Sequence, residues 1–122
     1  MKSYHQVISE INDGIASLRE SVPDAMAGFS ALAKGAMRAG ELSVAQKELI
    51  ALAIGVAGRC DGCIGFHAKA LARLGCPRAQ VMEMLAVAVY MGGGPSLMYA
   101  ADAVHAFDEF LTESEGRSSA PA

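Results

Sequence analysis

Apolar residues recur at intervals of three and four along almost the whole chain, which is the spacing of one face of an α-helix. The pattern predicts a first helix over residues 3–20. Its apolar stripe comprises Val7, Ile8, Ile11, Ile15 and Leu18. No segment alternates apolar and polar residues as a half-buried strand does. The sequence therefore predicts an all-α protein of about six helices.

The second and third helices have recognisable start signals. Pro23 suits the first turn of a helix that ends at Gly40. Ser43 and Gln46 form a capping-box pattern for a third helix over residues 44–58. The apolar face expected for the second helix comprises Met26, Phe29, Leu32, Ala33, Ala36 and Met37.

The third helix carries no charged residue between Glu48 and Arg59. A helix that is apolar on nearly all sides is usually surrounded by other helices. We therefore expect this helix to be the central one and Glu48 to enter buried territory near its start.

Glycine and proline divide the second half of the chain. A fourth helix is predicted from Cys60 or Asp61 to Leu74, with Gly75 at its C-terminal end. Pro77 then opens a fifth helix.

The glycine run Gly92–Gly94 breaks the fifth helix, and Pro95 begins a last helix. We expect one domain over residues 1–112. The small and polar residues 113–122 are predicted to be a disordered tail.

Composition adds an expectation about assembly. The 122 residues fit one domain, and 52% of them are apolar. Typical domains contain about 45–50% apolar residues. The excess suggests that some apolar surface is buried between subunits, so we expect a homo-oligomer. We expect the methionines at helical and junction positions to pack in the core and at subunit interfaces.

Charge and hydropathy exclude several classes of partner. The formal net charge is −3 and no basic run is present, which argues against nucleic acid. No apolar run is long enough to span a bilayer, so no membrane partner is expected. The polar N-terminal segment has no signal-peptide core, and a cytoplasmic location is the default.

The chemistry is concentrated between Glu48 and His67. Cys60 and Cys63 are three residues apart, and His67 follows Cys63 by four, so these spacings share one helix face. A Cys-x-x-Cys pair in a cytosolic chain indicates a redox or metal site. A helix N-terminus, with Arg59 next to it, favours a thiolate. A sulfenic acid formed on one cysteine could be resolved by the other as a reversible disulfide.

His67 and Glu48 complete the predicted catalytic group. His67, one turn beyond Cys63, can exchange a proton during thiol chemistry. Glu48 would fold back from the preceding helix to orient His67 or to relay protons. A thiol, a base and an orienting group are the elements of an activated nucleophile.

Other interpretations of the same residues remain open. Cys60 and Cys63 could be packed thiols in a non-catalytic oligomeric binding protein. Together with His67 and Glu48 they could form a four-ligand zinc set, although no second Cys or His pair is present. A lyase could use His67 as its base without the thiols. We expect neither a metal nor a cofactor.

The order of these residues resembles a known family. Glu48, eleven residues, Cys60, two residues, Cys63, three residues and His67 are similar to the signature of alkylhydroperoxidase D-like proteins, in the carboxymuconolactone decarboxylase superfamily. The resemblance covers roughly residues 24–112. It implies an all-helical subunit that assembles as a trimer or hexamer. It also implies reduction of a peroxide, with a cellular dithiol as the reductant.

The resemblance also implies individual roles. Cys63 would attack the peroxide and Cys60 would resolve the product, with His67 and Glu48 in the proton relay. The helix-end argument alone favours Cys60 as the more activated thiol, so the order of attack stays open. Gly62 departs from the well-characterised peroxidase of the family, which has a histidine at this position.

The remaining cysteine and histidines are expected to do less. Cys76 lies at a helix junction and reads as a packed thiol. His105 is expected on a helix face, and His5 in solvent.

Overall fold

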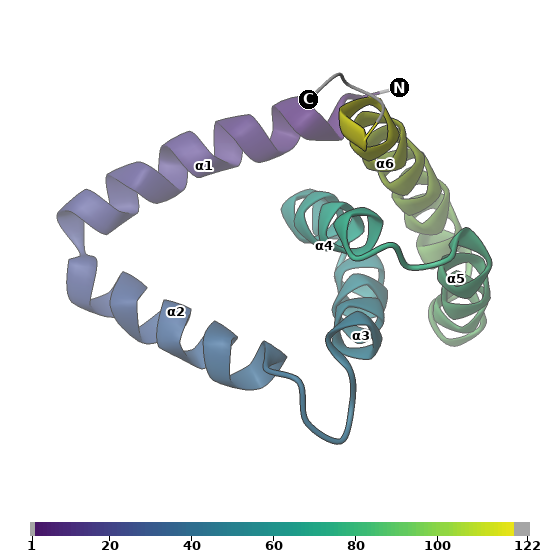
Figure 1. The fold of residues 1–122 in the computed structure, drawn as a ribbon, viewed down its shortest axis with the longest axis horizontal. Helices are drawn as coiled ribbons and strands as arrows, with labels where there is room; N and C mark the ends of the chain where they lie inside the picture. The colour runs from purple at the N-terminus through teal and green to yellow at the C-terminus, as the bar shows by residue number, and fades with distance from the viewer. Residues whose placement is uncertain (1, 119–122) are drawn as a thin grey trace.

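The computed structural model describes residues 2–118, and within this range it contains six α-helices and no strand (Figure 1). The prediction of an all-α fold is confirmed. None of these helices combines the length and the apolar character needed to cross a bilayer. The helices are α1 (Tyr4–Ser21), α2 (Pro23–Met37), α3 (Val44–Ala57), α4 (Asp61–Arg73), α5 (Arg78–Gly92) and α6 (Gly94–Ser118).

Helix α3 contacts α2, α4, α5 and α6, and α4 contacts α1, α3 and α6, so the two helices lie together inside the bundle. The side chains that fill the core are mainly aliphatic and aromatic, and α6 contributes Phe107 and Phe110. The largest fully buried side chains are Tyr4, Phe107, Phe110, Leu52, Ile64, Leu71, Val56 and Val81. The expectation that α3 is surrounded by other helices agrees with its contacts to four of them.

One side of α3 is exposed in the subunit. Leu52 and Val56 are fully buried, but Ile50 and Ile54 are 48% and 66% exposed. The uncharged sequence of α3 does not reveal this difference, because periodicity disappears when every face is apolar.

Most of the local start and stop signals are confirmed, although α2 ends at Met37 and not at Gly40. The Ser43 side chain accepts a hydrogen bond from the Gln46 amide at 3.0 Å, and the Gln46 side chain accepts one from the Ser43 amide at 2.8 Å. Pro23 begins α2. Gly75 follows α4 with φ +72°, a left-handed conformation that glycine adopts without steric cost.

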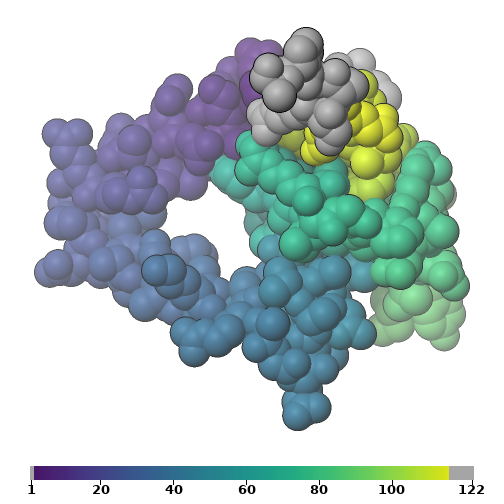
Figure 2. Space-filling view, in the orientation of Figure 1, coloured from purple at the N-terminus to yellow at the C-terminus, as the bar shows by residue number. Residues whose placement is uncertain are grey.

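Helices α1 and α2 form an arm that extends away from the other four helices (Figure 1). In the space-filling view an opening separates this arm from α3 and α4 (Figure 2). Only Tyr4 and Ile8 of α1 are buried, and no residue of α2 is. The apolar face predicted for α2 is thus present but is not buried within the subunit, where Phe29 and Leu32 are each 67% exposed.

The last helix is longer than the sequence suggested. It continues to Ser118 instead of ending near residue 112, and residues 119–122 lie outside the described range. Glu113 lies 3.4 Å from the His5 ring, so a contact with α1 accompanies the extension.

Glu109 of α6 attaches the start of α1 to the core. Its carboxylate accepts hydrogen bonds from the Ser3 hydroxyl and the Tyr4 amide, both at 2.8 Å. Burial opposes a charge at this position, but the bonds from Ser3 and Tyr4, together with the His5 amide and the nearby His105, hold the pKa of Glu109 below its usual value. The carboxylate therefore stays charged and keeps Tyr4 in its buried position.

We predict that Glu109→Ala lowers the free energy of unfolding by about 1–3 kcal/mol at neutral pH, because it removes a charged acceptor of two hydrogen bonds. The pKa of Glu109 is lower in the folded chain than in the unfolded chain. Its contribution is therefore present above about pH 4.3 and is lost as the pH falls through the folded-state value. Urea unfolding at neutral pH and at about pH 3 checks both statements.

Glu20→Ala, at the exposed end of α1, is the matched control and should change stability little. A Glu109→Ala deficit that persists undiminished in acid would contradict the assignment.

Candidate thiol redox site

The turn between α3 and α4 fixes the position of Cys60. The amide of Cys60 donates to the Gly55 carbonyl at 3.0 Å, and that of Arg59 donates to the Val56 carbonyl at 3.2 Å. This is the Schellman pattern of a helix C-terminus. Arg59 occupies its left-handed position with φ +55°, where glycine is usual. Cys60 is thereby placed one residue before α4.

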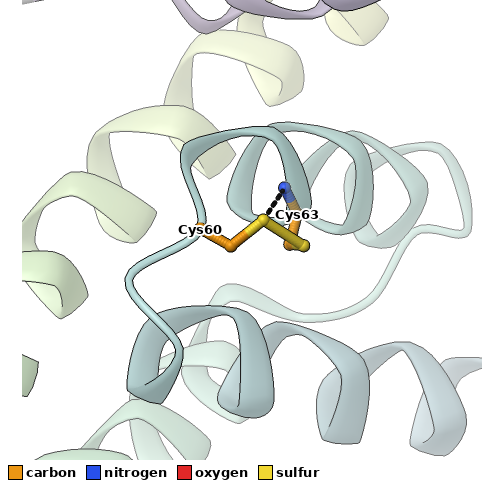
Figure 3. The surroundings of a disulfide bond; sticks show 2 residues. All are labelled: Cys60 and Cys63. Atoms are coloured by element: carbon orange, nitrogen blue, oxygen red, sulfur yellow. Dashed lines mark hydrogen bonds between the residues drawn. A yellow bond between two sulfur atoms is a disulfide. The ribbon is translucent and has the colours of Figure 1, made fainter. Parts of the chain in front are cut away.

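Cys60 is the N-cap of α4 and is joined to Cys63 by a disulfide (Figure 3). The Cα atoms of the pair are 5.2 Å apart, within the usual range for a disulfide. The Cys60 sulfur accepts a hydrogen bond from the Cys63 amide at 3.1 Å. The same amide and the positive end of the α4 dipole would stabilise a thiolate at Cys60.

Cys63 lies against the backbone of α3. A Cβ atom added at Gly55 would be only 3.0 Å from the Cβ of Cys63, which is tighter than nearly all real contacts of this kind. Gly55 is itself buried. The absence of a side chain at Gly55 therefore sets how closely α4 approaches α3 at the cysteine pair.

Glu48 and His67 join the same two helices. One carboxylate oxygen of Glu48 lies 2.6 Å from Nδ1 of His67. The Glu48 side chain is 12% exposed and that of His67 is 31% exposed. A carboxylate at one ring nitrogen orients the imidazole and sets its tautomer. The pair can hold a proton while remaining open to solvent on the histidine side.

The four residues predicted for the site therefore meet at the α3–α4 junction as two bonded pairs. Cys60 and Cys63 share the disulfide, and Glu48 and His67 share the hydrogen bond. Cys63 and His67 are one turn apart on α4, which places their side chains on the same face. Their catalytic roles remain predictions.

Gly62 lies under the side chain of Ile11. A Cβ atom there would lie 2.7 Å from Cδ1 of Ile11, so α1 packs over the first turn of α4. The side chain of Ile11 would have to move to admit any larger residue. The arm thus covers Gly62 in the first turn of α4.

Sequence reasoning missed two contributors. Gly55 carried a signal, since a glycine inside a helix suggests close approach of another element. Lys2 did not, although its ammonium lies 2.8 Å from Asp61, the residue after Cys60. This ion pair is about four-tenths exposed at both ends, so it partly balances the Asp61 charge beside the thiols.

The other cysteine and histidines lie elsewhere. Cys76 is buried at the opposite end of α4, and burial raises the pKa of its thiol. The Nε2 atom of His105 is 3.0 Å from the Lys2 carbonyl, and His5 is largely exposed. Among the described residues, no three His, Cys, Asp or Glu side chains are grouped as a metal site.

The helical fold and the cysteine pair define a class of small all-α proteins with a potential thiol centre. Residues 23–106 match the model of the carboxymuconolactone decarboxylase family. The chain belongs to this family. This is consistent with the resemblance to alkylhydroperoxidase D-like proteins.

Individual relatives support the same assignment. An uncharacterized protein of Cupriavidus necator is 42% identical over 101 residues, which cover 83% of this chain and 89% of the relative. An uncharacterized protein from the cox locus of Paracoccus denitrificans is 36% identical over 89 residues, covering 73% of this chain and 78% of the relative.

Two solved structures share the fold. A carboxymuconolactone decarboxylase family protein from Legionella pneumophila has a TM-score of 0.87 and 48% identity, covering 88% of this chain and 96% of its own. A family member from Thermotoga maritima has a TM-score of 0.79 and 26% identity, covering 93% and 96%. A role in the antioxidative response has been suggested for the Thermotoga protein.

We predict that Gly55→Val destabilises the chain by about 1–3 kcal/mol, since the new side chain overpacks the contact with Cys63. It should also speed reduction of the Cys60–Cys63 disulfide, because α4 must move away from α3. Urea unfolding and the rate of reduction by dithiothreitol measure the two effects.

Gly14→Val is the matched control, because a Cβ atom at Gly14 meets nothing within 4 Å. The control should leave both quantities nearly unchanged. Wild-type stability and an unaltered reduction rate in Gly55→Val would show that the helices do not depend on this contact.

Proposed function

We propose that this chain is a thiol-dependent peroxidase or disulfide oxidoreductase that alternates between a Cys60–Cys63 dithiol and a disulfide. The observation that carries the proposal is the cysteine pair at the N-terminus of α4, one turn from the Glu48–His67 pair. A thiolate-stabilising helix end and a carboxylate-oriented imidazole are the two parts that such chemistry needs.

The proposed cycle balances as follows. One thiolate attacks the terminal oxygen of a hydroperoxide, so that an S–O bond forms and the O–O bond breaks. His67, oriented by Glu48, supplies the proton that converts the departing alkoxide to an alcohol. The second thiolate then displaces hydroxide from the sulfenic acid, forming the disulfide and, after protonation, water. A cellular dithiol reduces the disulfide by exchange and is itself oxidised.

Two arguments bear on which thiol attacks first. The Cys63 amide donates to the Cys60 sulfur, which supports Cys60 as the stabilised thiolate. The resemblance to alkylhydroperoxidase D-like proteins supports Cys63 as the attacking thiol. A sulfenic-acid trapping reagent applied to Cys60→Ser and to Cys63→Ser distinguishes the two orders, because the attacking cysteine forms a stable adduct when its partner is removed.

We predict that Cys60→Ser and Cys63→Ser each abolish multiple-turnover peroxide consumption with a dithiol donor, since neither variant can close the disulfide. Wild-type protein treated with hydrogen peroxide should lose two hydrogens within the peptide that contains both cysteines. Peroxide assays and mass spectrometry check these outcomes. Cys76→Ala, at the far end of α4, is the control and should retain turnover.

Retained turnover in both serine variants would overturn the thiol cycle. The family also contains lactone decarboxylases, so a variant that lacks both thiols decides between the two chemistries. Unchanged conversion of a lactone acid by Cys60→Ser/Cys63→Ser would favour a lyase with His67 as its base. Absence of any turnover, with both thiols inert to peroxide, would favour a binding protein.

We also propose that the protein functions as a homo-oligomer, a trimer or hexamer, in the cytoplasm. The apolar face of α2 is exposed in the subunit, and Ile50 and Ile54 of α3 are exposed as well. A second exposed apolar group follows α5 and α6, comprising Val87, Tyr90, Met91, Leu97 and Met98. Exposed apolar surface on this scale is typical of an interaction site, and a second copy would bury it.

We predict that Phe29→Glu shifts the protein toward monomers, because it places a charge in the apolar face of α2. Ala31→Glu changes the charge equally on the opposite face of the same helix and is the control. Light scattering coupled to size-exclusion chromatography gives the mass of each variant. A monomeric wild-type protein would contradict the proposed assembly.

A further inference from the structure

An open groove of about 440 Å³ lies between the start of α3 and the second half of α4. Its walls are mainly apolar, with Val44 on α3, Phe66 and Ala70 on α4, and Leu74 directly after α4. Grooves of this size are large enough to hold small organic ligands. At one point the groove reaches Glu48, the carboxylate that binds His67.

Two cationic side chains also line this groove. Arg73 is exposed. Lys69 is half-buried, and its ammonium lies 5.8 Å from the centre of the Phe110 ring, which lines a separate hollow beside α1. No ion pair to a carboxylate engages either side chain within the described part of the chain. Glu48, the acidic residue of the groove, is already bonded to His67. The groove therefore combines an apolar wall with unneutralised positive charge.

The order of these groups along α4 gives the groove a direction. Arg73 lies six residues beyond His67, a rise of about 9 Å at roughly 1.5 Å per residue. Side chains on a helix lean toward its N-terminus, so that of Arg73 leans toward the half of α4 that carries the cysteines. An anionic group at Arg73 could thus accompany an apolar body that extends toward Glu48 and His67.

We propose that this groove binds substrates of the thiol site that carry a carboxylate on an apolar chain, with Arg73 as the contact for the carboxylate. The inference rests on the proposed function, and the substrates are organic hydroperoxides bearing a carboxylate. The carboxylate is held and does not react. The hydroperoxide end becomes an alcohol in the thiol cycle described above. Arg73 is a specificity-determining residue in this scheme, since guanidinium and carboxylate form charge-assisted hydrogen bonds.

The test compares the terminal hydroperoxide of octanoic acid with its methyl ester. Wild-type protein should show a higher kcat/KM for the acid, and the preference should arise from KM and weaken as the salt concentration rises. Arg73→Gln should reduce the acid-to-ester ratio of kcat/KM by about 5–10-fold, the size of one partly exposed charge-assisted contact. Arg73→Lys should restore part of it.

Arg19→Gln is the matched control, because it removes the same charge from the last turn of α1 and should leave the ratio unchanged. An acid-to-ester ratio in Arg73→Gln equal to that of the wild type would overturn the assignment of Arg73.

A separate measurement tests binding in the groove independently of the thiol reaction. Octanoate is not a peroxide, and its binding can be followed by calorimetry in the wild type, Arg73→Gln and Arg19→Gln. Binding that weakens only in Arg73→Gln supports the groove even if neither hydroperoxide is consumed, a result that would defeat the proposed function alone. Absence of octanoate binding to the wild-type protein would overturn the proposed binding site in the groove.

Discussion

Two contacts between α3 and α4 hold the parts on which the site depends. Near the turn, Gly55 allows the backbone of α3 to meet Cys63, and further along, the carboxylate of Glu48 meets the ring of His67. Gly55 and Glu48 are seven residues apart, so they lie on the same face of α3. The two helices are thus in contact at two points. These contacts fix the positions of Cys63 and His67 relative to α3.

The turn between α3 and α4 contains a residue in an unfavourable backbone conformation. Arg59 adopts a left-handed conformation that a residue with a side chain disfavours, and Gly75 occupies the equivalent place after α4. The Cys60 amide closes the C-terminus of α3, while the Cys60 sulfur caps α4. One residue therefore belongs to the ends of two helices, which fixes the thiol at the positive end of the α4 dipole.

The arm of α1 and α2 links the site to the rest of the surface. Ile11 packs over Gly62, and Lys2 pairs with Asp61, so α1 and the segment before it cover the first turn of α4. Beyond Ile8 the arm buries little within the subunit, and its apolar residues remain exposed. A second copy that covered the arm would also stabilise the helix that borders the cysteines, which would couple assembly to the site.

The sequence by itself determined the helices and the composition of the site. Helical periodicity, the Ser43 cap and Gly75 defined local structure, because each depends on residues only a few positions apart. The spacing of the Cys-x-x-Cys pair and His67 placed three groups on one face for the same reason. The sequence also led us to expect Glu48 beside His67, and the tertiary structure supplies the 2.6 Å contact. Only the tertiary structure decided that Gly55 sets the distance to Cys63 and that α2 stays exposed. Those outcomes depend on how whole helices pack, and an apolar residue does not reveal in the sequence whether its own chain or another will cover it.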